Sequence, residues 1–78
     1  MQTTETITAT SVETTREGLN LLVDGRTIHI PWEKCSDKLA SANEQERMNV
    51  ELSPGGYGIH WPLIDEDLSV NGLLRDRE

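Results

Sequence analysis

The sequence predicts a small α+β domain, in which an antiparallel sheet of two hairpins packs against short helices in the order β-β-β-α-β-β-α. Three observations carry this prediction: an Asp-Gly dipeptide between two apolar stretches, a helix-favouring stretch at 36–49, and a second pair of apolar stretches around a Pro-Gly-Gly loop. We expect a single domain over residues 1–78, with residues 1–4 and 75–78 frayed.

The first hairpin is predicted around Asp24-Gly25, which separates residues 19–23 from residues 26–30. Asp-Gly favours a two-residue type I′ turn, because both central residues need positive φ. A loop of this length puts the apolar residues of both strands on one face. These residues are Leu19, Leu21, Ile28 and Ile30. A Thr-rich stretch at 4–12 precedes the hairpin and predicts a further strand at a sheet edge.

The helical stretch at 36–49 carries two capping signals. Ser36 is a good N-cap, and Asn43 before Glu44-Gln45-Glu46 predicts a second helix start. We therefore expect either one kinked helix or two short ones. The inward-facing residues are predicted to be Leu39, Ala42 and Met48.

The second hairpin pairs residues 50–52 with residues 59–61, and Pro62 ends its second strand. Alternation places the apolar and aromatic residues on one face. These are Val50, Leu52, Tyr57, Ile59 and Trp61. Ser69 is expected to cap a final short helix whose apolar residues are Val70, Leu73 and Leu74.

Length and composition make an enzyme unfavourable. A chain of 78 residues with 35% hydrophobic residues and no Phe supports one modest core, because domains near this size bury only about 60% of the surface of the unfolded chain. A catalytic pocket would have to be built from little material. We therefore predict a protein that is not an enzyme and that uses no cofactor.

The net charge of −7, from 14 acidic and 7 basic residues, points to a basic protein partner. Nucleic acids and anionic membranes repel such a surface, since affinity for phosphates comes from cations. The alternative is that acidity only maintains solubility. A single cysteine, Cys35, and an N-terminus without an apolar signal region predict a cytoplasmic location. The Thr-rich edge strand leaves a homodimer as a further hypothesis.

The stretch from Gly56 to Pro62, followed by a carboxylate triplet, is the candidate site. It combines two aromatic residues, a histidine and three carboxylates within a few positions. Carboxylates can pair with arginines of a partner, and aromatic side chains supply apolar contact area. The predicted partner-binding residues are Tyr57, His60, Trp61, Asp65, Glu66 and Asp67. For the tryptophans, packing in the core is the competing interpretation.

A catalytic or metal-binding interpretation is weaker. His60 with Asp65 or Asp67 could act as a general base, but strand alternation makes His60 a half-exposed residue opposite Trp61. His29, His60 and Cys35 lack the spacing of a zinc site, so we predict no bound metal. Cys35 is interpreted as a small buried hydrophobic residue.

The chain also resembles a widespread bacterial family of domains of unknown function. The resemblance covers the chain from about residue 18 onward and is carried by a Gly-Ile-x-Trp-Pro segment at 58–62 and an Asp-x-Asp-Leu-Ser segment at 65–69. It includes further short segments. These are Trp32 to Ser36, Leu39-Ala40, Glu46-Arg47, Leu52-Ser53 and Leu73-Leu74.

The resemblance implies a small α+β fold and no established catalytic residues. It also implies two contexts: some members precede a helix-turn-helix segment, and others are encoded beside a small protein, as in toxin–antitoxin pairs. The leading hypothesis is a protein-interaction module, antitoxin-like, that binds a basic protein encoded nearby. The alternatives are a small metal- or His/Asp-dependent enzyme and a fragment of a transcriptional regulator without its DNA-binding segment.

Overall fold

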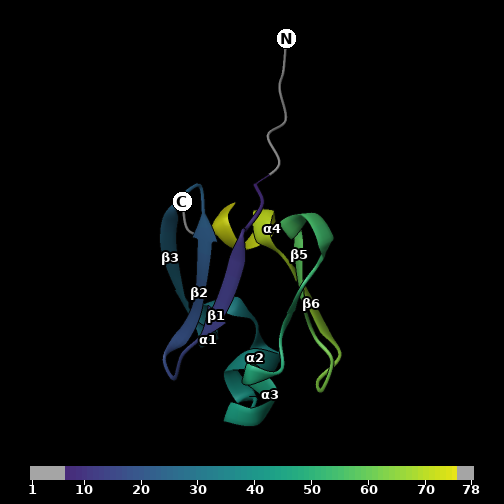
Figure 1. The fold of residues 1–78 in the computed structure, drawn as a ribbon. Helices are drawn as coiled ribbons and strands as arrows, with labels where there is room; N and C mark the ends of the chain where they lie inside the picture. Colours follow the sequence, from purple (N-terminus) through teal and green to yellow (C-terminus); the bar gives the residue numbers. More distant parts are fainter. Residues whose placement is uncertain (1–6, 76–78) are drawn as a thin grey trace.

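A computed structural model describes residues 7–75, which form two three-stranded antiparallel sheets and short helices (Figure 1). The strands are β1 (Ser11–Thr14), β2 (Gly18–Val23), β3 (Arg26–Pro31), β4 (Glu51–Leu52), β5 (Gly58–Trp61) and β6 (Glu66–Ser69). The helices are α1 (Trp32–Cys35), α2 (Asp37–Ser41), α3 (Glu44–Met48) and α4 (Val70–Arg75), with a 3-10 turn at Pro54–Gly56. The α+β class is confirmed.

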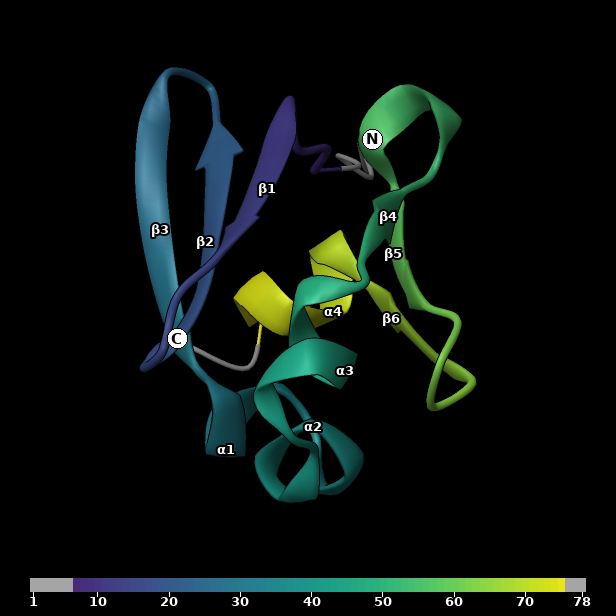
Figure 2. The ribbon, with the colours of Figure 1, turned by 60° about the horizontal axis from the view of Figure 1, so that its bottom comes forward.

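The two sheets stand on opposite sides of the molecule, in the strand orders β1-β2-β3 and β4-β5-β6 (Figure 1). Helix α4 lies between the sheets at one end of the molecule. Helices α1, α2 and α3 lie at the other end, which is turned toward the viewer in Figure 2. The inner faces of both sheets contribute to one core. Its fully buried side chains are Leu19, Leu21, Ile30, Leu39, Ile59, Trp61 and Val70.

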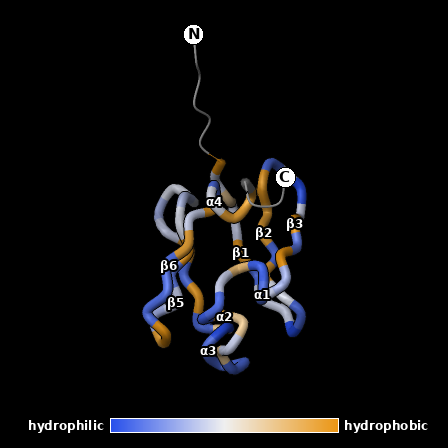
Figure 3. Tube along the Cα trace, turned by 180° about the vertical axis from the view of Figure 1, so that it is seen from behind, coloured by the Kyte–Doolittle hydropathy of each residue, from blue (hydrophilic) through white to orange (hydrophobic). Residues whose placement is uncertain are grey.

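The first hairpin forms in the predicted register. Val23 pairs with Arg26 and Leu21 pairs with Ile28, around a turn in which Asp24 and Gly25 have φ values of 53° and 77°. The type I′ turn therefore fixes which face of the hairpin enters the core. In Figure 3, β2 is coloured as strongly apolar, whereas the end formed by α2 and α3 is mostly hydrophilic.

The caps of α2 and α3 are confirmed, and the helical stretch is divided into short pieces. The Ser36 hydroxyl accepts a hydrogen bond from the amide of Leu39 (3.1 Å). Asn43 and Glu46 form a reciprocal capping box, with distances of 2.8 and 3.0 Å. Between the helices Ala42 adopts an extended conformation (φ −74°, ψ 155°), which stops the first helix before the second begins.

The predicted inward position of Met48 is wrong. The side chain of Met48 is 63% exposed, whereas Leu39 is buried as predicted. Met48 follows Leu39 at a spacing of about 2.5 helical turns, so even one continuous helix over 36–49 would place the two residues on opposite faces. Helix α3, which carries Met48, has no buried residue, and Ala42, which was also predicted to face inward, is partly buried.

The first strand begins later than predicted. Of the expected range 4–12, residues 4–6 lie outside the described part of the chain and residues 7–10 are not in a strand, whereas β1 spans Ser11–Thr14. The amide of Ala9 instead donates to the carbonyl oxygen of Gly56 (2.8 Å). This bond diverts the chain from the first sheet to the loop before β5.

Two members of the carboxylate triplet lie in a strand that the sequence did not predict. Glu66 and Asp67 belong to β6, which pairs with β5, while Asp65 lies in the preceding turn with a φ of 53°. Acidic residues have low strand propensity, but pairing with β5 outweighs that preference. The extra strand completes a second sheet, where the sequence indicated two hairpins of one sheet.

The final helix is confirmed, with the Ser69 hydroxyl accepting from the amide of Gly72 (2.9 Å). Of the residues predicted to fray, 1–4 and 76–78 lie outside the described part, and Arg75 is the last residue of α4. None of the helices between residues 7 and 75 is sufficiently long and apolar to cross a membrane.

Two glycines with positive φ test the contact between Ala9 and the turn at Gly56. A Cβ added at Gly56 (φ 78°) would clash with the carbonyl oxygen of Ala9, whereas a Cβ at Gly25 (φ 77°) meets nothing within 4 Å. We expect Gly25→Ala to lower the free energy of unfolding by about 1 kcal/mol and Gly56→Ala to lower it by about 2–4 kcal/mol. Urea denaturation measures both, and equal losses would contradict the contact.

Candidate interaction surface

The outer face of the second sheet carries a row of three polar side chains. Glu51 on β4 is opposite His60 on β5, and His60 is opposite Asp67 on β6. Residues that are opposite each other on neighbouring strands point to the same face. We call Glu51, His60, Asp67 and the exposed turn residue Asp65 the acidic face.

His60 and Asp67 are in direct contact within this row. The Nδ1 atom of His60 is 2.7 Å from Oδ1 of Asp67, and the two side chains are 38% and 74% exposed. The prediction of a half-exposed histidine opposite Trp61 is confirmed. A histidine oriented by a carboxylate is the geometry of a general base, but both groups here are open to water. The pair therefore lacks the enclosure that active sites provide.

The acidic face lies in a long part of the chain without cations. Residues 48–74 include four carboxylates and no lysine or arginine. Lys38 reaches this region from α2, where its Nζ donates to the backbone oxygens of Ile64 (3.3 Å) and Asp65 (3.2 Å) and lies 4.0 Å from Glu66 Oε1. Glu66 is thus partly neutralised, and it lies on the strand position opposite Trp61 rather than on the acidic face.

The two aromatic residues of the predicted contact set are separated by the fold. Tyr57 is 55% exposed, whereas Trp61 is 0% exposed and cannot contact a partner in this structure. Tyr57 was expected to point inward with Trp61. Gly55 and Gly56 have positive φ and Tyr57 itself is helical (φ −86°, ψ −29°), so the strand alternation begins only after it.

Sequence reasoning missed two contributors to this surface. Glu51 joins the row only through its pairing with His60, which the predicted hairpin register already contained. Leu63, in the turn between β5 and β6, is 54% exposed. The sequence signal for its exposure was its position, because Leu63 follows Pro62 and belongs to no segment with the hydrophobic period of a helix or strand. Leu63 and Tyr57 place apolar area near the two ends of β5.

Both tryptophans are structural. Their rings meet edge to face, with centroids 6.5 Å apart and planes at 79°. The indole N–H of Trp32 donates to the carbonyl oxygen of Thr15 (3.0 Å), and that of Trp61 donates to the carbonyl oxygen of Arg47 (3.1 Å). The core-packing interpretation of both residues is confirmed, since every polar atom of the buried indoles is satisfied.

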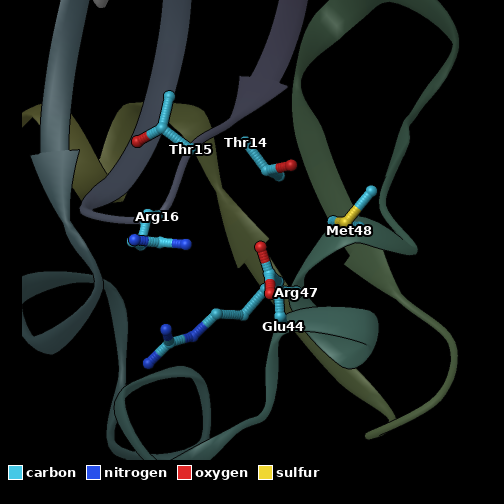
Figure 4. A pocket seen from close by; sticks show the side chains of 6 residues that line it. All are labelled: Thr14, Thr15, Arg16, Glu44, Arg47 and Met48. Carbon is cyan, nitrogen blue, oxygen red and sulfur yellow. The ribbon is translucent and has the colours of Figure 1, made fainter.

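A cleft of about 440 Å³ lies between the β1–β2 turn and α3 (Figure 4). It is lined by Thr14, Thr15, Arg16, Glu44, Arg47 and Met48. Figure 4 shows the side chain of Arg47 extending from α3 away from Met48. Its Nε and Nη2 atoms donate to the carbonyl oxygens of Leu39 (2.9 Å) and Ala40 (3.0 Å). Arg47 is therefore committed to the fold rather than to a ligand.

The other titratable residues of interest lie away from the acidic face. His29 is on the outer face of the first sheet, with Nδ1 2.7 Å from Asn20 Oδ1. Among the described residues, no group of three or more His, Cys, Asp or Glu side chains could hold a metal ion. Cys35 is buried, and its Sγ lies 3.8 Å from the carbonyl oxygen of Ile30. Burial raises the pKa of the Cys35 thiol to about 11, although the charge of Arg47 opposes this shift.

The raised pKa of Cys35 predicts a loss of stability in base. The unfolded chain releases the thiol proton near the ordinary pKa of 9.0, while the folded chain keeps it up to about 11. The stabilising contribution is therefore complete below pH 9 and is lost as the pH rises toward 11. We expect the unfolding free energy of the wild type to fall over this range relative to that of Cys35→Ala. Parallel curves for the two proteins would contradict the assignment.

Comparison with known proteins shows the family of this chain and a solved structure with a similar fold. A crystal structure, at 2.75 Å resolution, of a protein of unknown function from Rhodospirillum rubrum has a TM-score of 0.79 and 27% sequence identity, and the match covers 90% of this chain and 87% of that one. No match was found among curated proteins. A family model described as "Protein of unknown function (DUF2442)" matches residues 9–78. The chain therefore belongs to this family.

Proposed function

We propose that the domain is a non-catalytic protein-interaction module that binds a basic protein through the acidic face. The observation that carries the proposal is the charge distribution of residues 48–74, where four carboxylates occur without a lysine or arginine. Lys38 approaches only Glu66 among the side chains of these carboxylates. The remaining carboxylates are available to the cations of a partner, which they attract over several ångströms of solvent.

The residues of the acidic face, together with Tyr57 and Leu63, support a protein as the partner. Exposed carboxylates can form bidentate pairs with arginines, and Tyr57 and Leu63 offer apolar area of the kind that anchors an interface. His60 adds a ring that Asp67 already orients at 2.7 Å. Nucleic acid is disfavoured as the ligand, because its phosphates would meet these carboxylates.

The biological form of this proposal is an antitoxin-like domain that acts in the cytoplasm on a basic protein encoded nearby. It rests on the family resemblance, on the single buried Cys35, which fits a reducing compartment, and on the charge. Binding an acidic domain to a basic protein would cover the cations with which that protein contacts its own target. Association would be fast at low salt and strongly slowed by added salt.

One observation favours a second function. The 2.7 Å contact of His60 with Asp67 is the arrangement that a His/Asp-dependent hydrolase needs. The exposure of both side chains argues for the first proposal, since bulk water weakens each electrostatic interaction in such a pair. His60→Gln separates the two functions: it would abolish hydrolysis, whereas a binding surface that depends on carboxylates would be little affected.

The test compares charge reversals on and off the acidic face. The paired substitution Glu51→Lys/Asp67→Lys should weaken binding of the basic neighbour-encoded protein at least about tenfold, since exposed ion pairs contribute about 0.2–1 kcal/mol each and reversal adds repulsion. The control Glu13→Lys/Glu33→Lys changes the net charge equally at exposed positions in β1 and α1. Isothermal titration calorimetry at two salt concentrations measures both.

Two results would contradict the proposal. Equal weakening by both pairs would show that only net charge matters. An absence of binding by the wild type to every basic protein encoded beside its gene would remove the proposed partner class.

A further inference from the structure

Three of the four outer strands of the two sheets are protected against pairing with another chain. Strand β1 lies against β4, and β4 is only two residues long. Strand β6 carries Glu66 and Asp67, and Lys38 binds the backbone beside its start. Short length, charges and coverage are the usual devices that keep sheet edges from associating. Within residues 7–75, the remaining outer strand, β3, has none of them along its centre.

The direction of the backbone groups in β3 follows from the hydrogen bonds of β2. The amide of Thr10 donates to the carbonyl oxygen of Leu22 (2.7 Å), and the amide of Thr15 donates to that of Gly18 (2.8 Å). The even-numbered residues of β2 therefore direct their backbone groups at β1. In an antiparallel ladder this direction alternates along the strand, so the odd-numbered residues face β3.

Two residues of β3 consequently point their amide and carbonyl groups at the open edge. Thr27 is opposite Leu22 and His29 is opposite Asn20, and both partners on β2 are directed at β1. In the described part of the chain, β3 pairs with β2 alone. Thr27 and His29 are two positions apart along the strand. An added antiparallel strand forms its backbone hydrogen bonds at every second residue, so both positions can pair with it.

We propose that this edge is a homodimer interface, at which β3 of one chain pairs antiparallel with β3 of a second copy. A two-fold register places Thr27 of each copy opposite His29 of the other, so that each such pair exchanges both of its hydrogen bonds. The same register places Ile28 opposite Ile28 of the second copy. Pro31, which has no amide proton, then falls opposite the turn residue Gly25, and the pairing ends where the strand ends.

The two-fold register favours a second copy as the occupant of this edge, and β3 is the outer strand at which charge opposes this least. Two chains with a net charge of −7 repel each other, and the carboxylates of β6 would increase that repulsion. Strand β3 contains Arg26 and no carboxylate, so it is an edge at which two copies can approach. The half-buried Ile28 adds apolar contact at the symmetry axis. Closed two-fold dimers are also the commonest protein assemblies.

The dimer would extend the first sheet and leave the acidic face of the second sheet free. It differs from the homodimer expected from sequence, which used the Thr-rich first stretch. It is independent of the proposed function, because a dimer can form whether or not a basic partner exists.

The test uses the full chain in analytical ultracentrifugation. Thr27→Pro removes an amide that faces the open edge, so it spares the ladder with β2 but blocks the added strand. We expect it to raise the dimer dissociation constant at least about tenfold. Thr27→Ala keeps the backbone donor and should leave the constant nearly unchanged. A monomeric wild type at all concentrations, or equal constants for the proline and alanine variants, would overturn the proposal.

Amide hydrogen exchange of the wild type gives a second readout that needs no variant. The amides of Thr27 and His29 should be protected at concentrations where the dimer forms and should exchange fast on dilution. The amide of Ile28, which bonds to β2, should be protected under both conditions. Concentration-independent exchange at Thr27 and His29 would exclude this edge even if a dimer forms elsewhere.

Discussion

The guanidinium of Arg47 is the contact on which the rest of this structure depends. It donates to the carbonyl oxygens of Leu39 and Ala40, at the end of α2, and lies 5.1 Å from the ring centroid of Trp32. The backbone oxygen of the same residue accepts the indole N–H of Trp61. One residue of a helix with a single turn thereby joins α1, α2 and β5. Helices this short are unstable alone, so these contacts, rather than helix propensity, hold that end of the molecule together.

This framework decides which residues remain for function. The tryptophans and Cys35, which are the chemically distinctive residues of the sequence, are buried and have their polar groups satisfied. The groups left at the surface include carboxylates, lysines, arginines, two histidines and the exposed side chains of Met48, Tyr57 and Leu63. In a protein interface such polar groups belong to the rim, and the aromatic and apolar groups supply the buried centre. The proposed contact with another macromolecule rests on these exposed groups.

The sequence predicted the features that depend on local chemistry. Asp24-Gly25 determined the first hairpin and its register, and Ser36, Asn43 and Ser69 marked three helix starts. Features set by distant contacts were not predictable in this way. The positive φ values of Gly55 and Gly56 turned Tyr57 outward, whereas the exposure of Met48 follows from its helical spacing from Leu39 and could have been predicted. Strand β6 formed from poor strand formers because β5 was available to pair with them. The row at His60 likewise needed the pairing of all three strands of its sheet.

The most direct test of this account is a double-mutant cycle between Arg47 and Trp32, with Arg47→Met and Trp32→Phe and their combination measured by urea denaturation. If the guanidinium and the indole act together to join the helices, their effects on the free energy of unfolding will not add. The account predicts a coupling energy of about 0.5–1 kcal/mol. Effects that add within about 0.3 kcal/mol would show that Arg47 and Trp32 stabilise the fold separately.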